Sequence, residues 1–258
     1  MARKNDGSPE LGVMTDGRAV HIVTMSKGGV GKTLCSWHLA QWLRSKGRKT
    51  DVIDLDPMSH SLAEYRGLGA RTVDLLTGID MTLNGPAVDQ LSEDMLTGDG
   101  DWVLDNGAAG FVGLTRYLVD NEFSAMLGGY GGRLVVHAVL GGGSMSEQCL
   151  VGLGTLLDAF KDVRFVIWLN EYQKPFVVDG MRLEEMVGFK DNVTRIAGVV
   201  RLPSLSAHFL ADFDRMREDR LTFDEALGSP KFLLMNRQRL TVIRRGVWDQ
   251  LDKLGIVA

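Results

Sequence analysis

The segment Met25-Ser26-Lys27-Gly28-Gly29-Val30-Gly31-Lys32-Thr33 decides the fold of this chain. It follows a β-rich run over 19–25. It precedes a stretch from Lys32 to about Arg44 whose apolar residues recur every three to four positions, as on one helix face. A glycine-rich loop between a strand and a helix is the context that a phosphate-binding loop requires. The segment therefore predicts a nucleotide-binding P-loop.

Each residue type in this loop suits phosphate chemistry. Glycines let backbone N–H groups turn toward phosphate oxygens, and the helix N-terminus adds partial positive charge. Lys32 can reach the β- and γ-phosphates, and the Thr33 hydroxyl can bind Mg²⁺. We therefore predict that ATP or ADP binds with Mg²⁺. The loop residues expected to contact the nucleotide are Gly28, Gly29, Val30, Gly31, Lys32, Thr33 and Leu34.

Further apolar runs indicate a sheet. They cover 50–55, 101–105, 133–140, 163–169 and 194–200, and a helix is predicted from about Ser144 to Phe160 with Ser144 and Glu147 as a capping box. Alternating strands and helices indicate a parallel sheet, and near-continuous apolar strands indicate that both of its faces are covered. We predict an α/β fold with a single doubly wound, mostly parallel sheet and helices on both faces. The domain would span 18–258, after a disordered tail at 1–17.

Composition excludes several classes of protein. The chain has 258 residues, with 29 Lys and Arg against 33 Asp and Glu, so its net charge of −4 does not attract nucleic acid globally. Two cysteines cannot form a disulfide framework or a four-cysteine zinc site. The sequence shows neither a run of ~20 apolar residues nor a signal peptide, so we expect a cytoplasmic protein without membrane contact.

Two aspartates follow predicted strands and complete the phosphate site. Asp105 ends an apolar strand, which is the Walker B pattern, and we expect it to bind Mg²⁺ through water. Asp56 follows the strand at 50–55. Two residues after Asp105, Gly107 either lets the backbone approach the γ-phosphate or forms a plain turn.

The loop departs from the general Gly-x4-Gly-Lys-Thr pattern, with Ser26 in place of the first glycine and an additional Lys27. This variant resembles the deviant Walker A loop of the ParA/MinD ATPases, which are SIMIBI-type P-loop NTPases. The resemblance implies an ATP-sandwich homodimer in which Lys27 reaches the phosphates held by the partner subunit, as an arginine finger does. It also implies that Asp56 orients the attacking water and lies near the metal. The family continues with Gln-Gly-Asn where this chain has Met58-Ser59-His60, so contacts of that segment do not carry over.

Two residues are expected near the base. Asn170 follows the run at 163–169, and ligands of open α/β sheets lie at such carboxyl ends. Its amide offers a donor and an acceptor to an adenine edge, although it could instead cap a turn. Pro203 follows a later strand and is expected to line the base pocket.

Several segments also resemble ParA-like proteins encoded in plasmid conjugal-transfer regions, among them 105–109, 136–143, 168–171, 220–227 and 237–240. Their order across most of 19–255 implies a slow ATPase, stimulated by a partner or by DNA. It would act in plasmid transfer, partition or maintenance with an unidentified transfer or partition protein. Two alternatives remain open. One is an ATP-dependent metabolic ligase or kinase of the same fold, similar to dethiobiotin synthetase, and the other is a nucleotide-gated scaffold without significant hydrolysis.

The segment 231–245 holds five basic residues and no acid. The family resemblance implies nonspecific DNA binding there, and a solvated basic helix face is the alternative. An apolar stripe runs through this segment and beyond it, and acids at Asp249 and Asp252 favour a helix docked on the core over a membrane-binding one. The residues of the stripe are Leu240, Ile243, Val247, Leu251 and Leu254.

Overall fold

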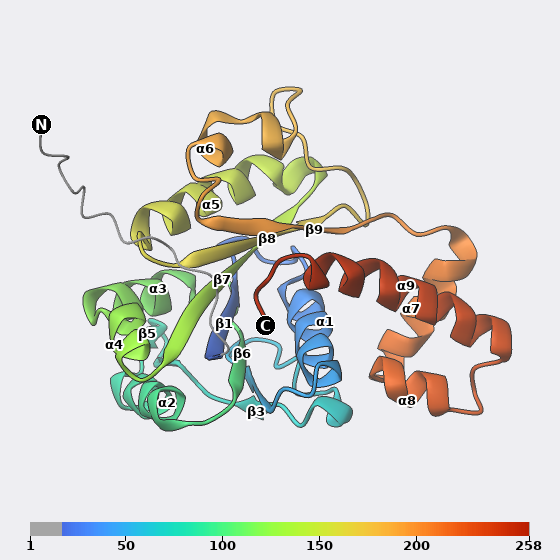
Figure 1. Ribbon diagram of the computed structural model, residues 1–258, viewed down its shortest axis with the longest axis horizontal. Helices are drawn as coiled ribbons and strands as arrows, with labels where there is room; N and C mark the ends of the chain where they lie inside the picture. The colour runs from blue at the N-terminus through green and yellow to red at the C-terminus, as the bar shows by residue number, and fades with distance from the viewer. Residues whose placement is uncertain (1–16, 258) are drawn as a thin grey trace, which may run out of the picture.

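The chain folds around a seven-stranded sheet in the order β3-β2-β6-β1-β7-β8-β9, and every neighbouring pair of strands is parallel (Figure 1). A computed structural model describes residues 17–257, so the tail predicted at 1–17 lies outside the described residues except for Gly17. A separate antiparallel pair joins β4 to β5. The strands are β1 (Arg18–Thr24), β2 (Thr50–Asp54), β3 (Arg71–Thr72), β4 (Leu76–Thr77), β5 (Thr82–Leu83), β6 (Asp101–Asp105), β7 (Gly132–Gly141), β8 (Arg164–Asn170) and β9 (Ile196–Leu202).

Helices cover both faces of the sheet. On one face, α1 packs against β1, β2 and β6 and touches α9, which packs on β9 (Figure 1). On the other face, α4 and α5 pack on β7, and α3 packs against α4 and α5. The α-helices are α1 (Lys32–Ser45), α2 (Gly85–Thr97), α3 (Phe111–Asp120), α4 (Phe123–Gly129), α5 (Ser146–Ala159), α6 (Val187–Lys190), α7 (Ala207–Glu218), α8 (Phe223–Gly228) and α9 (Leu234–Asp252). The 3₁₀-helices are η1 (Arg66–Leu68), η2 (Gly143–Met145) and η3 (Leu183–Glu185).

This topology positions a binding site. From β1 the chain moves to β2 and β6 on one side, and later to β7, β8 and β9 on the other. In open α/β sheets ligands bind outside the carboxyl ends of the strands, where the strand order reverses. The loop that follows β1 lies at this reversal.

The α/β fold class is confirmed, and the six main strands match their predicted ranges to within two residues at either end. The capping box predicted at Ser144 and Glu147 is wrong. Residues Gly143–Met145 first form a 3₁₀ turn, so α5 begins at Ser146 and its N-cap residue, Met145, offers no side-chain hydrogen bond. The short strands β3, β4 and β5 were not predicted, because two residues carry no readable periodicity.

The apolar stripe of α9 is docked on the core, as predicted. Leu240, Ile243, Val247 and Leu251 are buried. Both cysteines are free thiols and buried. Within residues 17–257, none of the helices combines the length and the apolar character needed to cross a bilayer.

Candidate nucleotide-binding site

The P-loop between β1 and α1 has the backbone of an anion cradle. Gly29 and Gly31 have φ of 75° and 97°, in the left-handed region that favours glycine. A Cβ atom on Gly31 would lie 2.5 Å from Nδ2 of Asn170, whereas a Cβ on Gly28 or Gly29 would meet nothing within 4 Å. The loop is therefore packed against Asn170 beneath Gly31 and open at Gly28 and Gly29, where a phosphate would approach.

Lys32 folds back over this loop. Its side chain is 7% exposed, and its Nζ donates a hydrogen bond of 3.2 Å to the carbonyl oxygen of Lys27. Burial lowers the pKa of Lys32, while the carboxylates of Asp105 and Asp56 act in the opposite direction. The ammonium group thus lies against the loop and within electrostatic reach of two acids. Lys27 itself is half-buried on the same loop.

Asp105 at the end of β6 is held by two hydroxyl groups of α1. Thr33 Oγ1 donates to Oδ2 at 2.7 Å and Ser36 Oγ donates to Oδ1 at 2.9 Å. Burial raises the pKa of Asp105 to about 7, and these two hydrogen bonds oppose that rise. Thr33 and Asp105 therefore lie together, and their binding of Mg²⁺ stays a prediction. Ser36 was not predicted, although its position three residues after Thr33 places it on the same side of the helix.

Asp56 lies on the loop after β2, which a buried neighbour anchors. Asp54 accepts backbone N–H groups from Asp56 at 3.1 Å, Leu62 at 2.8 Å and Ala63 at 3.0 Å. Asp56 Oδ1 accepts the backbone N–H of Met58 at 3.0 Å. A Cβ on Gly107 would lie 2.8 Å from Cγ of Asp56, so that glycine gives the aspartate its room.

Oxygen atoms make up the candidate metal site. Thr33 Oγ1 and the Asp105 carboxylate are hard donors of the kind that Mg²⁺ prefers. Among the residues that the structure describes, three or more His, Cys, Asp or Glu side chains do not gather into a metal-binding group. The residues fit a magnesium ion that is shared with nucleotide phosphates, because such ions bind through few protein ligands.

Asn170 supports the P-loop directly. Its Nδ2 donates to the carbonyl oxygen of Val30 at 2.9 Å, and its Oδ1 accepts the N–H of Tyr172 at 3.3 Å. The amide thus caps a turn and ties the end of β8 to the loop. Contact with a base stays a prediction. A cavity of about 200 Å³ adjoins these residues and is lined in part by Gly29, Leu34 and Tyr172.

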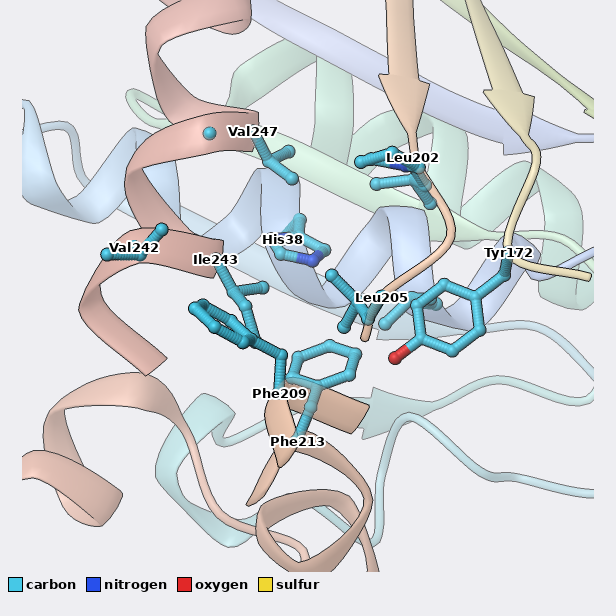
Figure 2. A pocket seen from close by; sticks show the side chains of 12 residues that line it. His38, Tyr172, Leu202, Leu205, Phe209, Phe213, Val242, Ile243 and Val247 are labelled. Atoms are coloured by element: carbon cyan, nitrogen blue, oxygen red, sulfur yellow. The ribbon is translucent and has the colours of Figure 1, made fainter. Parts of the chain in front are cut away.

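A second hollow, which we name the apolar pocket, lies among α1, α7, α9 and the end of β9 (Figure 2). It encloses about 220 Å³, and Leu34 and Tyr172 line it as well as the first cavity. Pro203 lines this pocket and directly follows Leu202, the register partner of Asn170 in β8. Among residues 17–257, nothing forms a hydrogen bond with the buried atoms His38 Nδ1 and Tyr172 Oη, and burial lowers the pKa of His38 to about 3. Sequence reasoning missed this pocket because its lining comes from residues as distant as Leu34 and Val247.

The basic segment 231–245 makes mostly internal contacts. Lys231 pairs with Asp219, Arg239 with Asp212 and Arg244 with Asp224. Arg237 donates to the carbonyl oxygens of Phe232 and Ser229, and Arg245 is exposed. These contacts are those of a solvated and internally paired helix face, and DNA binding by the segment stays a prediction.

The sequence of this chain matches a family model and known relatives. The family model described as the CobQ/CobB/MinD/ParA nucleotide binding domain matches residues 21–239. Protein TraL of Escherichia coli is 35% identical over 240 residues, which cover 92% of this chain and 99% of TraL. The MinC:MinD cell division protein complex of Aquifex aeolicus matches at a TM-score of 0.48 and 15% identity, over 89% of this chain and 94% of the other. MinD of Pyrococcus horikoshii, complexed with Mg-ADP, matches at a TM-score of 0.46 and 17% identity, over 92% and 97% of the two chains.

Proposed function

The chain belongs to the CobQ/CobB/MinD/ParA nucleotide-binding domain family, and from this premise we propose that it is a slow, Mg²⁺-dependent ATPase that forms a homodimer around ATP. Its similarity to TraL, together with the sequence resemblance above, supports a role in plasmid conjugal transfer, partition or maintenance. The observation that carries the proposal is one loop with two lysines, Lys27 and Lys32, joined to Asp105 through the hydroxyl of Thr33.

The phosphates would lie over the open glycines of the P-loop. There Lys32 would exchange its hydrogen bond with the Lys27 carbonyl for bonds to phosphate oxygens, which are stronger because they are charge-assisted. Thr33 and Asp105 would hold the magnesium ion. When bound, Mg²⁺ neutralises negative charge on the β- and γ-phosphate oxygens.

Water positioning falls to Asp56. Phosphoryl transfer needs an attacking oxygen in line with the leaving group, so a carboxylate that only holds the water in place is sufficient. Asp56 is suited to this because its own orientation is fixed by the N–H of Met58 and by packing against Gly107.

Lys27 would complete the site of a second subunit. Its carbonyl oxygen already serves Lys32, whereas its half-buried side chain extends from an open loop. A cation supplied by a partner stabilises the charge that builds up on the transferred phosphoryl group. Hydrolysis would then require two chains, which suits a protein whose partners read its nucleotide state.

The adenine ring would lie over Leu34 and Tyr172, which face both cavities. Asn170 would flank it on the P-loop side and Pro203 on the side of the apolar pocket. A flat aromatic base gains most from such apolar and aromatic neighbours. We therefore expect the purine to lie between the two cavities, in contact with the two residues that line both of them.

Phosphate release with Mg·ATP tests the proposal. The wild type should release phosphate well below the ~10 s⁻¹ that is typical of enzymes, and Asp56→Ala should bind ATP normally but release phosphate on the order of 10²-fold more slowly. Release that Asp56→Ala leaves unchanged would contradict the role of Asp56. ATP binding without any release by the wild type would favour a nucleotide-gated scaffold. Turnover that accelerates strongly with a small-molecule phosphoryl or ligation acceptor would favour a metabolic kinase or ligase.

A further inference from the structure

The loop that follows Asp56 brings an unassigned hydroxyl to the site. Ser61 Oγ lies 3.0 Å from Thr33 Oγ1, which in turn donates to Asp105 Oδ2 at 2.7 Å. Because the single proton of Thr33 goes to the carboxylate, Ser61 must be the donor to Thr33. Two hydrogen bonds therefore join Ser61 on the loop after β2 to Thr33 at the start of α1, and Thr33 to Asp105 at the end of β6.

Ser61 is held in this place by its neighbours. The two residues after it, Leu62 and Ala63, donate their backbone N–H groups to the fully buried carboxylate of Asp54. Just before it, His60 has a φ of 43°, so the chain turns sharply there. Met58 at the loop tip is 78% exposed, in contrast to the anchored end. The hydroxyl of Ser61 is thus positioned by the fold and is not a freely placed surface group.

The spacing of these oxygens suits a magnesium ion. Mg²⁺ binds oxygens at about 2.0–2.1 Å in an octahedron, so two adjacent ligands lie about 3 Å apart. The pair formed by Ser61 and Thr33, at 3.0 Å, has this separation. Hydroxyl oxygens are also hard donors that keep a lone pair for a cation when their protons point elsewhere.

We propose that Ser61 Oγ is a ligand of the magnesium ion that accompanies the nucleotide, adjacent to Thr33. The inference rests on the proposed function, since it needs Mg·nucleotide at the P-loop. Rotation about the Cβ–Oγ bond of Ser61 turns a lone pair toward the ion without moving the backbone. Ser61 then links metal binding to the loop that carries Asp56. The loop after β2 departs from the family pattern at Met58–His60. Ser61 lies outside that stretch and would hold the loop at the metal in its place.

The experiment is calorimetric titration of ADP, in Mg²⁺ and in EDTA, into the full chain and three variants. In the wild type, Mg²⁺ should strengthen ADP binding relative to EDTA. In Ser61→Ala this strengthening should be about 10-fold smaller, whereas ADP should bind in EDTA as it does to the wild type. Ser61→Thr keeps the hydroxyl and should retain the gain. Ser59→Ala is the matched control, a serine of the same loop that is exposed and 3.5 Å from Ser61 Oγ, and it should behave as the wild type.

The other outcomes separate the proposed function from the inference about Ser61. A wild type that binds no nucleotide would overturn the proposed function and this inference with it. A normal Mg²⁺ gain in Ser61→Ala would overturn the inference alone. An equal loss of affinity in Mg²⁺ and in EDTA would make Ser61 a structural residue and would also overturn it. Urea unfolding of each variant, run beside the titrations, checks that it is folded. If Ser61→Ala is not folded, Ser61→Cys takes its place, because a soft sulfur replaces the oxygen at similar size, and a normal Mg²⁺ gain in it would overturn the inference.

Discussion

The two ends of the proposed nucleotide site, the phosphate end at the P-loop and the base end at the apolar pocket, are built in different ways. At the phosphate end, one continuous segment, 25–36, meets the ends of two strands, and both oxygens of Asp105 accept hydroxyl protons from α1. At the base end, apolar side chains from distant segments line a pocket in which His38 Nδ1 and Tyr172 Oη find no hydrogen-bond partner within the described part of the chain. The phosphate end is therefore a local structure with polar groups already arranged, whereas the base end depends on tertiary packing. Substitutions should therefore have large effects at the first end and smaller ones at the second.

The largest effect is expected from Lys32→Ala. Removing a buried cation that pairs with phosphate costs about 2–5 kcal/mol, so ATP should bind at least ~30-fold more weakly in calorimetry. Lys46→Ala is the control, because Lys46 lies at the far end of α1 and pairs with Asp252. Unchanged ATP affinity in Lys32→Ala would contradict the proposal that this loop binds the phosphates.

Asp105→Asn should change how the stability of the protein depends on pH. Burial raises the pKa of Asp105 from 3.8 to about 7. The stability that this group contributes is therefore complete below about pH 3.8 and is lost as the pH rises through 7. At pH 8 the variant should be more stable to urea than the wild type by about 1–4 kcal/mol, and at pH 4 the difference should be close to zero.

The same variant should lose the affinity gain that Mg²⁺ gives to ADP binding, since a neutral amide replaces the carboxylate. Stability gained together with function lost is expected where a charged group is buried for binding. A variant that is less stable than the wild type at pH 8 would show that the hydrogen bonds from Thr33 and Ser36 outweigh the cost of burial.

Tyr172→Ala tests the base end and should have the smallest effect. Loss of one aromatic contact costs about 1 kcal/mol, so ATP should bind ~5-fold more weakly while inorganic phosphate binding is unchanged. Tyr172→Phe is the matched control, because it removes only a hydroxyl to which no residue of 17–257 forms a hydrogen bond, and it should bind ATP as the wild type does. An effect as large as that of Lys32→Ala would contradict the contrast between the two ends.

The sequence predicted the elements that form the phosphate end because their pattern is contiguous. The strand, glycine loop and helix at 18–45 and the acid that ends β6 need no tertiary information to be recognised. The supporting groups could not be read in the same way. Ser36, Asp54 and Ser61 act through contacts across 69, 9 and 28 residues, and serines and aspartates at such spacings are common in any sequence.

The base end shows the same limit more strongly. Asn170 and Pro203 were both expected beside the base, and that contact stays a prediction. The sequence did not indicate that Asn170 also bonds to the P-loop or that Pro203 lines the apolar pocket. Which strand ends lie together follows from the parallel order of the sheet. Which side chains face each other across them depends on the packing of α7 and α9, and apolar periodicity does not encode that packing.

The trans role of Lys27 is tested most directly by light scattering after size-exclusion chromatography, on Asp56→Ala to prevent turnover. With Mg·ATP the mass should be twice the 28.3 kDa of one chain, and with Mg·ADP it should be that of one chain. Lys27→Gln in the same background should stay a single chain in both nucleotides while it still binds ATP. Dimers that form equally with Lys27→Gln, or a mass that ignores the nucleotide, would contradict the account.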